Sequence, residues 1–323
     1  MSSPLDLTPP VVLAPMAGIT DLPFRSLVQG FGAGLVVSEM VASQEMVQGK
    51  PGTRERAALG LGRAGTAVQI AGREAHWMAE AARRVEGAGA RIIDINMGCP
   101  AKKVVNGLSG SALMRDPDHA LRLIEAVVSA VSVPVTLKMR LGWDESAMTA
   151  PDIARRAEAA GVRMITVHGR TRCQFYTGRA DWAAIRAVTE AVEVPVVANG
   201  DIRSAADARA ALADSGAAGV MIGRGIRGQP WLIAGIAAEL YGTPAPAVPG
   251  PAALADLVVG HVDASCRFYG RELGTRVVRK HLGWYLDHAA PRTPLRRMIL
   301  TADGPEALAR LLPDALAREA RAA

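Results

Sequence analysis

Short runs of consecutive hydrophobic residues recur along the first two thirds of the chain, and stretches with helical periodicity lie between most of them. Runs that are apolar at every position are typical of parallel strands buried on both faces. The predicted strands are Val11–Met16, Leu35–Met40, Thr66–Ala71, Arg91–Met97, Pro134–Arg140, Met164–His168, Pro195–Asn199 and Gly219–Ile222. The predicted helices between them include Arg73–Ala88, Asp118–Ala130, Ala150–Ala160 and Ala205–Asp214. This alternation predicts an α/β fold, a (β/α)8 TIM barrel, with a doubly wound sheet as the competing architecture.

The barrel pattern ends near Tyr241, and a proline-rich segment follows it. Residues 242–251 contain four prolines, which lack a backbone N–H and restrict their neighbours, so this segment is predicted to be a linker. The predicted helices beyond it are Ala252–Tyr269, Gly274–His288, Arg292–Leu300 and Pro305–Ala320. We therefore expect a barrel domain over residues 1–241, a linker over 242–251 and a helical domain over 252–323.

Hydrophobic residues make up 50% of the 323-residue chain and charged residues 21%, which is typical of a globular protein. The formal net charge is +6, and residues 261–300 hold eight basic residues against three acidic ones. The basic residues are Arg267, Arg271, Arg276, Arg279, Lys280, Arg292, Arg296 and Arg297. This local excess indicates a polyanionic partner, with ordinary solvated helix faces as the alternative.

Sequence features of membrane, exported and metal-binding proteins are missing. No run of eighteen apolar residues occurs, and the N-terminal residues 1–6 lack the basic and apolar regions of a signal peptide. The three cysteines, Cys99, Cys173 and Cys266, are too few for a disulfide framework, and no CxxC or HExxH pair is present. We therefore expect a cytoplasmic protein with reduced thiols, without membrane association, a metal site or an obligate protein partner.

Polar or unusual residues stand at the ends of the predicted strands. Enzymes with this barrel carry their active sites at the C-terminal ends of the strands. The residues at these ends are Pro15-Met16-Ala17, Ser38-Glu39-Met40, Gln69, Asn96-Met97-Gly98-Cys99-Pro100, Lys138-Met139-Arg140, His168-Gly169-Arg170, Asn199-Gly200-Asp201 and Gly223-Arg224. Any one of them could be structural, but eight such ends at one rim favour an active site.

The ends of the last two predicted strands have the composition of a phosphate site. Asn199-Gly200-Asp201 and Gly223-Arg224-Gly225 offer small residues for close backbone approach and a guanidinium for charge. Opposite them, Gln69 could bond the polar edge of a planar heterocycle. Lys138 could stabilise negative charge on a reduced flavin, with a salt bridge in the barrel mouth as the alternative. These groups suit FMN, and another phosphorylated ligand is the alternative.

Cys99 lies between Gly98 and Pro100, just beyond the fourth predicted strand, in a loop expected to face the pocket. Free thiols have a pKa near 8.5, so most are protonated at neutral pH and can donate a proton. No metal partner and no histidine close in sequence mark Cys99 as a thiolate. The sequence therefore favours a proton donor here, with a nucleophile as the alternative.

Taken together, these motifs resemble the tRNA-dihydrouridine synthases, and most of all their bacterial B-type branch. The most specific part is Asn96-Met97-Gly98-Cys99-Pro100 followed by Lys102-Lys103-Val104. The matching stretches are Ala14–Asp21, Val37–Met40, Asp94–Val104, Gly110–Leu113, Thr166–Arg172, Ala198–Ile202, Met221–Gly225 and Arg279–His281. The resemblance covers essentially the whole chain, including the predicted helical domain.

The resemblance implies an FMN enzyme that uses NADPH to reduce the C5–C6 double bond of a uridine in tRNA, in the D-loop. It implies that Cys99 donates the proton to C5 and that Asn96 lies beside the reacting base. The implied flavin-binding residues are Pro15, Met16, Ala17, Gln69, Lys138, His168, Asn199, Gly200, Asp201, Gly223 and Arg224. The implied tRNA contacts are Lys102, Lys103, Arg170, Arg279, Lys280 and His281.

The implied chemistry agrees with the residues. Hydride transfer to uracil C6 creates enolate character at C4–O4, so C5 has to be protonated, and a thiol opposite the flavin meets that need. The base has to be extruded from the folded tRNA, whose binding should weaken steeply as salt rises. One alternative is an FMN barrel oxidoreductase of the dihydroorotate dehydrogenase type that acts on a free small molecule, which leaves the basic helical domain unexplained. A non-catalytic RNA-binding barrel leaves Cys99 and the phosphate-site glycines unexplained.

Overall fold

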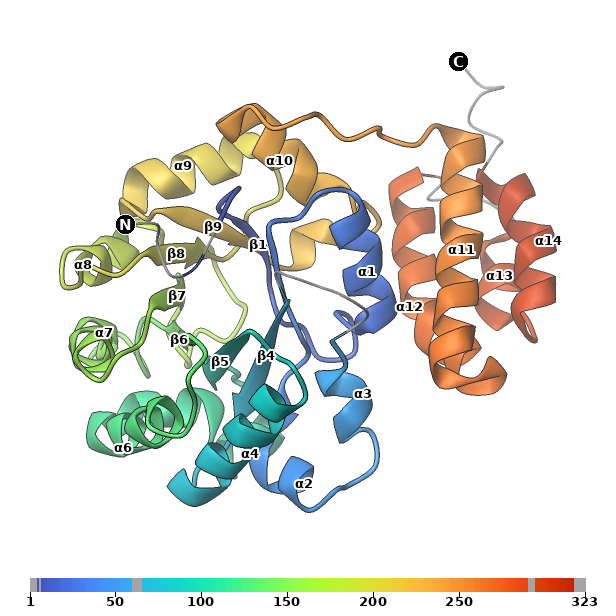
Figure 1. Cartoon of the computed structure of the whole chain (residues 1–323). Coiled ribbons are helices and arrows are strands. Elements are labelled where there is room, and N and C mark those ends of the chain that lie inside the picture. Colours follow the sequence, from blue (N-terminus) through green and yellow to red (C-terminus); the bar gives the residue numbers. More distant parts are fainter. Residues whose placement is uncertain (1–4, 6, 60–65, 290–293, 317–323) are drawn as a thin grey trace.

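Eight parallel strands form a closed barrel at the centre of the larger lobe of the protein (Figure 1). The computed structural model describes residues 5, 7–59, 66–289 and 294–316. The strands are β1 (Val11–Leu13), β2 (Leu35–Val37), β4 (Thr66–Ala71), β5 (Ile92–Met97), β6 (Val135–Arg140), β7 (Met164–His168), β8 (Val196–Asn199) and β9 (Gly219–Ile222), with a short β3 (Val41–Ala42) beside β4. Because β1 pairs with both β2 and β9, and β2 with β4, the sheet closes. The predicted TIM barrel is confirmed, and an open doubly wound sheet is excluded.

The strands form where consecutive residues are apolar and buried on both faces. Ile95 of β5 and Val197 of β8, for example, have no exposed surface. From β4 to β9 the main strands agree with the predicted ranges to within one residue, whereas β1 and β2 end three residues early, at Leu13 and Val37. The residues that follow these two early ends leave the sheet at the rim of the barrel.

Helices surround the barrel (Figure 1). They are α1 (Leu22–Gly30), α2 (Ser43–Val47), α3 (Thr53–Ala57), α4 (Ala75–Gly87), α5 (Lys102–Val105), α6 (Pro117–Val128), α7 (Ala150–Ala159), α8 (Arg186–Thr189), α9 (Ala205–Ser215) and α10 (Leu232–Tyr241), with 3-10 turns η1 (Gly110–Arg115), η2 (Ala183–Ile185) and η3 (Arg224–Ile226). The side chain of Ser204 caps α9 by accepting a 3.1 Å hydrogen bond from the Asp207 N–H, an interaction that stabilises a helix by about 1 kcal/mol. Within the described ranges, no helix has both the length and the apolar character needed to cross a membrane.

Four further helices, α11 (Pro251–Tyr269), α12 (Arg271–Ala289), α13 (Arg296–Thr301) and α14 (Pro305–Leu316), pack into a bundle beside the barrel (Figure 1). Residues 242–250 before them contain no helix or strand. The bundle has its own apolar cluster, in which Val258, Leu282 and Leu312 are completely buried. α13 begins four residues later than predicted, and both Arg292 and the predicted helix end at Ala320 lie outside the described residues.

An aromatic contact joins the bundle to α1. The ring of Phe24 lies 5.8 Å from that of His261 on α11 and 4.8 Å from that of His281 on α12. His281 is only 2% exposed. His281 therefore packs in the interface between the two lobes, and the substrate contact expected at this residue stays a prediction.

Candidate active site

A cavity of about 530 Å³ opens at the C-terminal rim of the barrel. Cys99 and Asn96 line it from the end of β5. Its wall also contains every residue that the sequence predicted to bind the cofactor: Pro15, Met16, Ala17, Gln69, Lys138, His168, Asn199, Gly200, Asp201, Gly223 and Arg224. One cavity of a size that suits a small molecule therefore brings together residues from most of the strand ends.

Lys138 lines the cavity from β6, and its ammonium group donates a hydrogen bond of 3.0 Å to Asn199 Oδ1. Asn199 Nδ2 in turn donates to the carbonyl oxygen of Met221 at 2.8 Å, which fixes the orientation of the amide. Burial lowers the pKa of Lys138 to about 8, against the opposing charge of Asp94. The lysine therefore has a neutral hydrogen-bond partner and keeps most of its charge at neutral pH.

His168, at the end of β7, lines the cavity, and one of its ring nitrogens is buried without a partner in the described part of the chain. The residue is 9% exposed, and its Nδ1 has no hydrogen-bond partner within the described residues. Burial, together with the charges of Lys138 and Arg140, holds the pKa of the ring well below its usual range. Because a buried polar atom without a partner is costly, this nitrogen suits a hydrogen-bonding group of a ligand.

The loops after β8 and β9 form a cradle that needs small residues. Gly200 has a φ of +121°, and a Cβ there would lie 2.7 Å from the Ala180 side chain. A Cβ on Gly225 would lie 2.4 Å from a backbone carbonyl oxygen. The guanidinium of Arg224, 3.7 Å from Asp201, supplies positive charge at the same place. Close backbone approach with a guanidinium is an arrangement that suits a phosphate group.

Arg170 lies beneath the rim rather than on it. Its side chain is 2% exposed and forms an ion pair of 2.5 Å with Asp201. It also donates hydrogen bonds to the carbonyl oxygens of Thr177 (2.9 Å) and Gly178 (2.7 Å). These contacts hold the loop after β7 in place. Arg170 therefore supports this loop, and the substrate contact expected at this residue stays a prediction.

Arg140 and Tyr176 are among the cavity residues to which the sequence pattern assigned no role. Arg140 donates hydrogen bonds of 2.8 Å to the carbonyl oxygens of Gly98, beside Cys99, and Phe175. The exposed ring of Tyr176 lies 5.4 Å from the guanidinium of Arg140 and 4.7 Å from that of Arg224. An aromatic ring next to two guanidinium groups suits a planar ligand. The sequence placed Arg140 at a strand end without a role, whereas Tyr176 lies within a loop.

The backbone of Cys99 is held on both sides. Its N–H donates a 3.0 Å hydrogen bond to Asn96 Oδ1, and its carbonyl oxygen accepts from the N–H (3.1 Å) and the hydroxyl (2.9 Å) of Ser111. Asn96 donates to Gln69 at 2.7 Å, and Gln69 donates to the buried Asp94 at 2.6 Å. The half-buried thiol at the cavity wall is therefore attached to a fixed segment. Asp94, inside β5, belongs to a stretch that matches the family, but the sequence pattern gave it no role.

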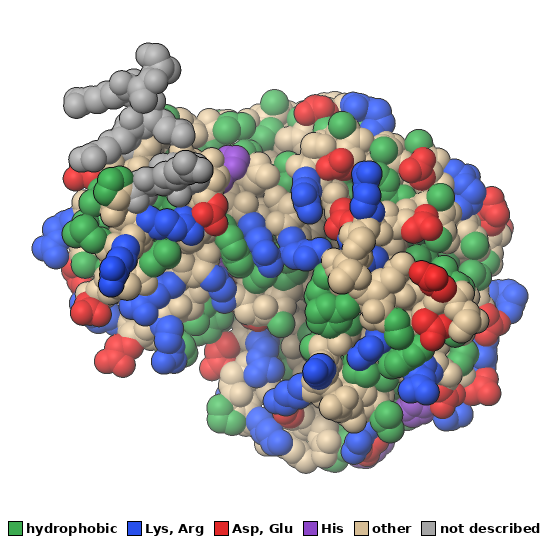
Figure 2. Space-filling model, turned by 180° about the vertical axis from the view of Figure 1, so that it is seen from behind, with side chains coloured by type: hydrophobic (Ala, Val, Ile, Leu, Met, Phe, Trp, Pro, Cys, Tyr) green, Lys and Arg blue, Asp and Glu red, His purple; other side chains and the backbone are tan. Residues whose placement is uncertain are grey.

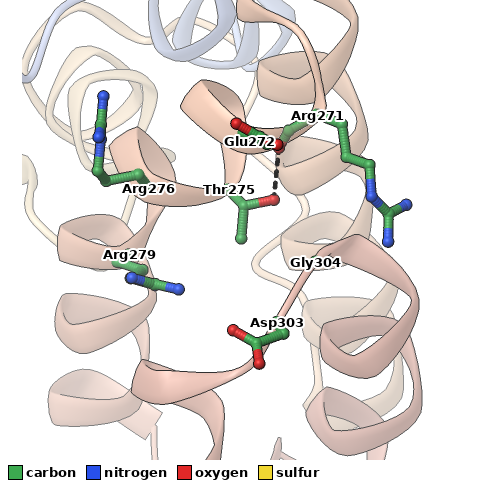
Figure 3. A pocket seen from close by; sticks show the side chains of 7 residues that line it. All are labelled: Arg271, Glu272, Thr275, Arg276, Arg279, Asp303 and Gly304. Carbon is green, nitrogen blue, oxygen red and sulfur yellow. Dashed lines mark hydrogen bonds between the residues drawn. The ribbon is translucent and has the colours of Figure 1, made fainter.

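The basic residues of the bundle do not share one surface. Arg276 and Arg279 line a pocket of about 360 Å³ between α12 and the turn before α14, with Asp303 opposite them (Figure 3). Arg271, at the edge of this pocket, forms an ion pair with Glu306. Among the described residues, Arg276 and Arg279 form no ion pair, in contrast to Arg271.

Lys280 faces the barrel. A Cβ on Gly18, in the loop between β1 and α1, would lie 3.3 Å from its Nζ. Burial lowers the pKa of Lys280, against the opposing charges of Asp21 and Glu39. Glu39 also accepts a hydrogen bond of 2.5 Å from the Gly18 N–H. Lys280 thus lies between the bundle and the loop that continues from the cavity residues 15–17.

The family comparison agrees with this geometry. The family model described as dihydrouridine synthase (Dus) matches residues 12–321. The chain belongs to this family. It is therefore an oxidoreductase, and the family predicted from its motifs is confirmed. Membership of the family implies a flavin cofactor.

Named relatives match over nearly the whole chain. A Rhodobacter capsulatus protein named "probable tRNA-dihydrouridine synthase" is 63% identical over 319 residues, 98% of each chain. A Rhizobium leguminosarum protein of the same name is 60% identical over 283 residues, 87% of this chain and 86% of that one. A Xanthomonas campestris protein named tRNA-dihydrouridine synthase B is 46% identical over 315 residues, 96% of this chain and 94% of that one. The similarity therefore includes the barrel, the bundle and a relative of the B type.

A solved structure is similar in fold. It is histamine dehydrogenase from Rhizobium sp. 4-9, with a TM-score of 0.54 and 14% identity over 79% of this chain. The chain spans about half of that protein, 49% of its length. At this identity the similarity concerns the barrel fold alone.

Proposed function

We propose that this protein is a tRNA-dihydrouridine synthase that reduces the C5–C6 double bond of a D-loop uridine in tRNA, with bound FMN and with NADPH as the reductant. The observation that carries the proposal is the rim cavity, in which the Cys99 thiol, a half-buried lysine and a glycine-rich cradle lie together in a chain of the dihydrouridine synthase family. Because the substrate is tRNA, we expect the enzyme to act in the cytoplasm.

FMN fits the residues of the cavity. Arg224 and the small residues after β8 and β9 would hold the phosphate, and a polar group of FMN would satisfy His168 Nδ1. Lys138 would stabilise the negative charge of the reduced ring, since its pKa of about 8 leaves it mostly charged at neutral pH. When bound, FMN supplies the hydride that is added to uracil C6.

Cys99 would donate the proton that C5 then requires. Hydride addition at C6 leaves negative charge spread toward O4, and protonation at C5 completes the reduction. The thiol lines the cavity, and Asn96 and Ser111 fix its backbone, so its position is defined before the substrate binds. The thiolate that remains is half-buried, and solvent can return its proton.

The mouth of the cavity suits an extruded base. A uracil that leaves the tRNA stack needs a new stacking partner and groups that neutralise nearby phosphate. Tyr176 offers an exposed ring, and Arg140 and Arg224 flank it with positive charge. This arrangement supports a nucleotide as the substrate.

The tRNA body would lie across both lobes. Figure 2 shows Lys and Arg side chains on both sides of the hollow between the bundle and the barrel. Lys102 and Lys103 are exposed on α5, directly after the Cys99 segment, and Arg276 and Arg279 face the bundle pocket. Cations at these places would contact phosphates and make binding dependent on salt.

The test uses the purified protein, NADPH and an unmodified tRNA transcript. We expect the protein to be yellow, to release FMN on denaturation, and to form dihydrouridine in the transcript, detected by mass spectrometry of its nucleosides. Mass spectrometry of tRNA from a deletion strain, with and without the restored gene, would locate the modified uridine. Reduction of free uracil derivatives without reduction of tRNA would replace this proposal by a small-molecule oxidoreductase.

A further inference from the structure

We propose that Asp94 is a positioning residue for the reaction and that it fixes the backbone of Cys99 through Gln69 and Asn96. The proposal rests on the proposed function, in which Cys99 is the proton donor. Asp94 is 2% exposed and is not among the residues that line the cavity. It can therefore act on the chemistry only through its neighbours.

Asp94 lies within β5, directly opposite Gln69 on β4 and Thr136 on β6. One oxygen of its carboxyl group accepts a 2.6 Å hydrogen bond from Gln69 Nε2. The other oxygen accepts a 2.6 Å hydrogen bond from Thr136 Oγ1. The buried carboxyl group therefore has one partner that belongs to the cavity wall and one that does not.

A chain of hydrogen bonds continues from Gln69 to Cys99. Gln69 Oε1 accepts a bond of 2.7 Å from Asn96 Nδ2. Asn96 Oδ1 then accepts from the N–H groups of Gly98 (3.2 Å) and Cys99 (3.0 Å). Four hydrogen bonds thus connect Asp94, in the interior of the barrel, to the segment that carries the Cys99 thiol.

Only one orientation of the two side-chain amides lets every donor in this series of hydrogen bonds meet an acceptor. The backbone N–H groups of Gly98 and Cys99 are donors, so Asn96 has to turn its oxygen toward them and its NH2 group toward Gln69. Gln69 then turns its oxygen toward Asn96 and its NH2 group toward Asp94. Without an acceptor at Asp94, a buried donor of Gln69 is unsatisfied and nothing holds the amide in this orientation.

This series of hydrogen bonds needs an acceptor oxygen at residue 94, and it does not need a negative charge there. In Asp94→Asn the side-chain oxygen can still accept from Gln69 while the new NH2 group donates to the Thr136 hydroxyl. Asp94→Leu has a similar shape and no acceptor. Thr136→Val is the matched control, because it removes the other hydrogen bond of the same carboxyl group and leaves the chain to Cys99 complete.

The variants are compared as FMN-loaded enzymes in a Cys173→Ser, Cys266→Ser background, where Cys99 is the remaining thiol. In Asp94→Leu, reoxidation of the reduced flavin by tRNA should slow roughly 10- to 100-fold per bound FMN, as for a misplaced reacting group. Its reduction by NADPH should match that of Asp94→Asn, which removes the same charge beside Lys138. Alkylation of Cys99 by iodoacetamide, without tRNA, should accelerate about threefold or more as its segment loosens. Asp94→Asn and Thr136→Val should stay within about twofold of the background in both measurements.

A double variant tests whether Asp94 acts through Gln69. Adding Asp94→Leu to Gln69→Leu should slow reoxidation by tRNA little further, because Gln69→Leu already interrupts the hydrogen bonds between Asp94 and Cys99. The proposal is overturned if the two substitutions reduce the reoxidation rate additively. It is also overturned if Asp94→Asn or Thr136→Val reduces this rate as much as Asp94→Leu does. If Asp94→Leu does not fold, Gln69→Leu alone has to accelerate alkylation, and an unchanged rate overturns the proposal. Alkylation needs no turnover, so failure of the enzyme to reduce tRNA would refute the proposed function separately.

Discussion

The ammonium group of Lys138 on β6 donates a 3.0 Å hydrogen bond to the side-chain oxygen of Asn199 on β8, and so connects two strand ends at the mouth of the barrel. Burial holds the pKa of this lysine at about 8, below its ordinary value of 10.5. Its charge is therefore present at neutral pH and is lost as the pH rises through about 8. Stabilisation of an anionic reduced flavin by this charge should follow the same pH dependence.

We expect Lys138→Met to weaken FMN binding or to slow flavin reduction by NADPH, by about tenfold, because the compensating charge is lost. We expect the reduction rate of the native enzyme to decline between about pH 7 and pH 9, and the variant should lose this decline. Stopped-flow measurement of flavin absorbance gives both quantities. Lys50→Met, at an exposed lysine outside the cavity, is the control. Unchanged FMN content together with unchanged NADPH oxidation in Lys138→Met would refute this role.

Cys99→Ala should separate the two half-reactions. Reduction of the flavin by NADPH should proceed near the native rate, while reoxidation by tRNA should slow by roughly 10²–10⁴, the usual effect of a positioned general acid. Cys99→Ser should retain little activity, because a hydroxyl is a far weaker acid than a thiol. Stopped-flow measurement of each half-reaction tests this.

The alternative for Cys99 is a packing role between Gly98 and Pro100. In that case Cys99→Ala would lose stability or FMN but keep its reoxidation rate per bound FMN. Cys173→Ala, at an exposed cysteine, should behave as the native enzyme in both half-reactions. Normal reoxidation by tRNA in Cys99→Ala rules out the proton donor.

The rim cavity could be predicted because it depends on positions along the chain. In a parallel barrel all strands end at one rim, so Gln69, Asn199 and Arg224 meet although they lie far apart in sequence. Asp94 could not be placed in the site in this way. A buried acid within a strand gains its role only from partners on the neighbouring strands, here Gln69 and Thr136.

The basic cluster of the bundle shows the limit of counting charges. Arg279, Lys280 and His281 are consecutive, and successive residues of a helix point about 100° apart, so they do not share a face. Arg279 lines the bundle pocket, Lys280 faces the loop at Gly18, and His281 is buried against Phe24. The charge of this helix could be predicted from the sequence, whereas the direction of each side chain depends on the packing of the bundle against the barrel.

Arg276 and Arg279 should carry part of the salt dependence of tRNA binding. We expect Arg276→Gln combined with Arg279→Gln to raise the Kd for tRNA and to reduce the slope of log K against log salt by about 1 to 2, because each phosphate contact releases counterions. NADPH oxidation without tRNA should not change. Binding titrations at several salt concentrations measure the slope.

A pair of arginines elsewhere provides the matched control. Arg155→Gln combined with Arg156→Gln removes the same charge from α7, on the side of the barrel away from the bundle (Figure 1). This variant should keep the native slope. If affinity and slope both stay native in the Arg276 and Arg279 variant, the RNA-binding surface lies elsewhere.

Asp21 caps α1 from a buried position. Its carboxyl group accepts a 3.1 Å hydrogen bond from the Phe24 N–H and is 2% exposed. Burial raises the pKa of Asp21 from 3.8 to about 6. Because the folded protein binds this proton more tightly than the unfolded chain, the contribution of Asp21 to stability is fully present below about pH 4 and is lost as the pH rises through about 6.

We expect Asp21→Asn, which keeps a capping oxygen and removes the buried charge, to raise the free energy of unfolding at pH 7 by up to about 3 kcal/mol, the value of a shift of about two pKa units. It should also flatten the change in stability between about pH 4 and pH 6. Urea unfolding at a series of pH values measures both effects. Asp116 caps α6 in the same way, because its carboxyl group accepts a 2.9 Å hydrogen bond from the His119 N–H, but it is exposed. The control variant Asp116→Asn should therefore change neither the free energy of unfolding at pH 7 nor its dependence on pH. If the Asp21→Asn protein keeps the native dependence of stability on pH, another buried group carries that dependence.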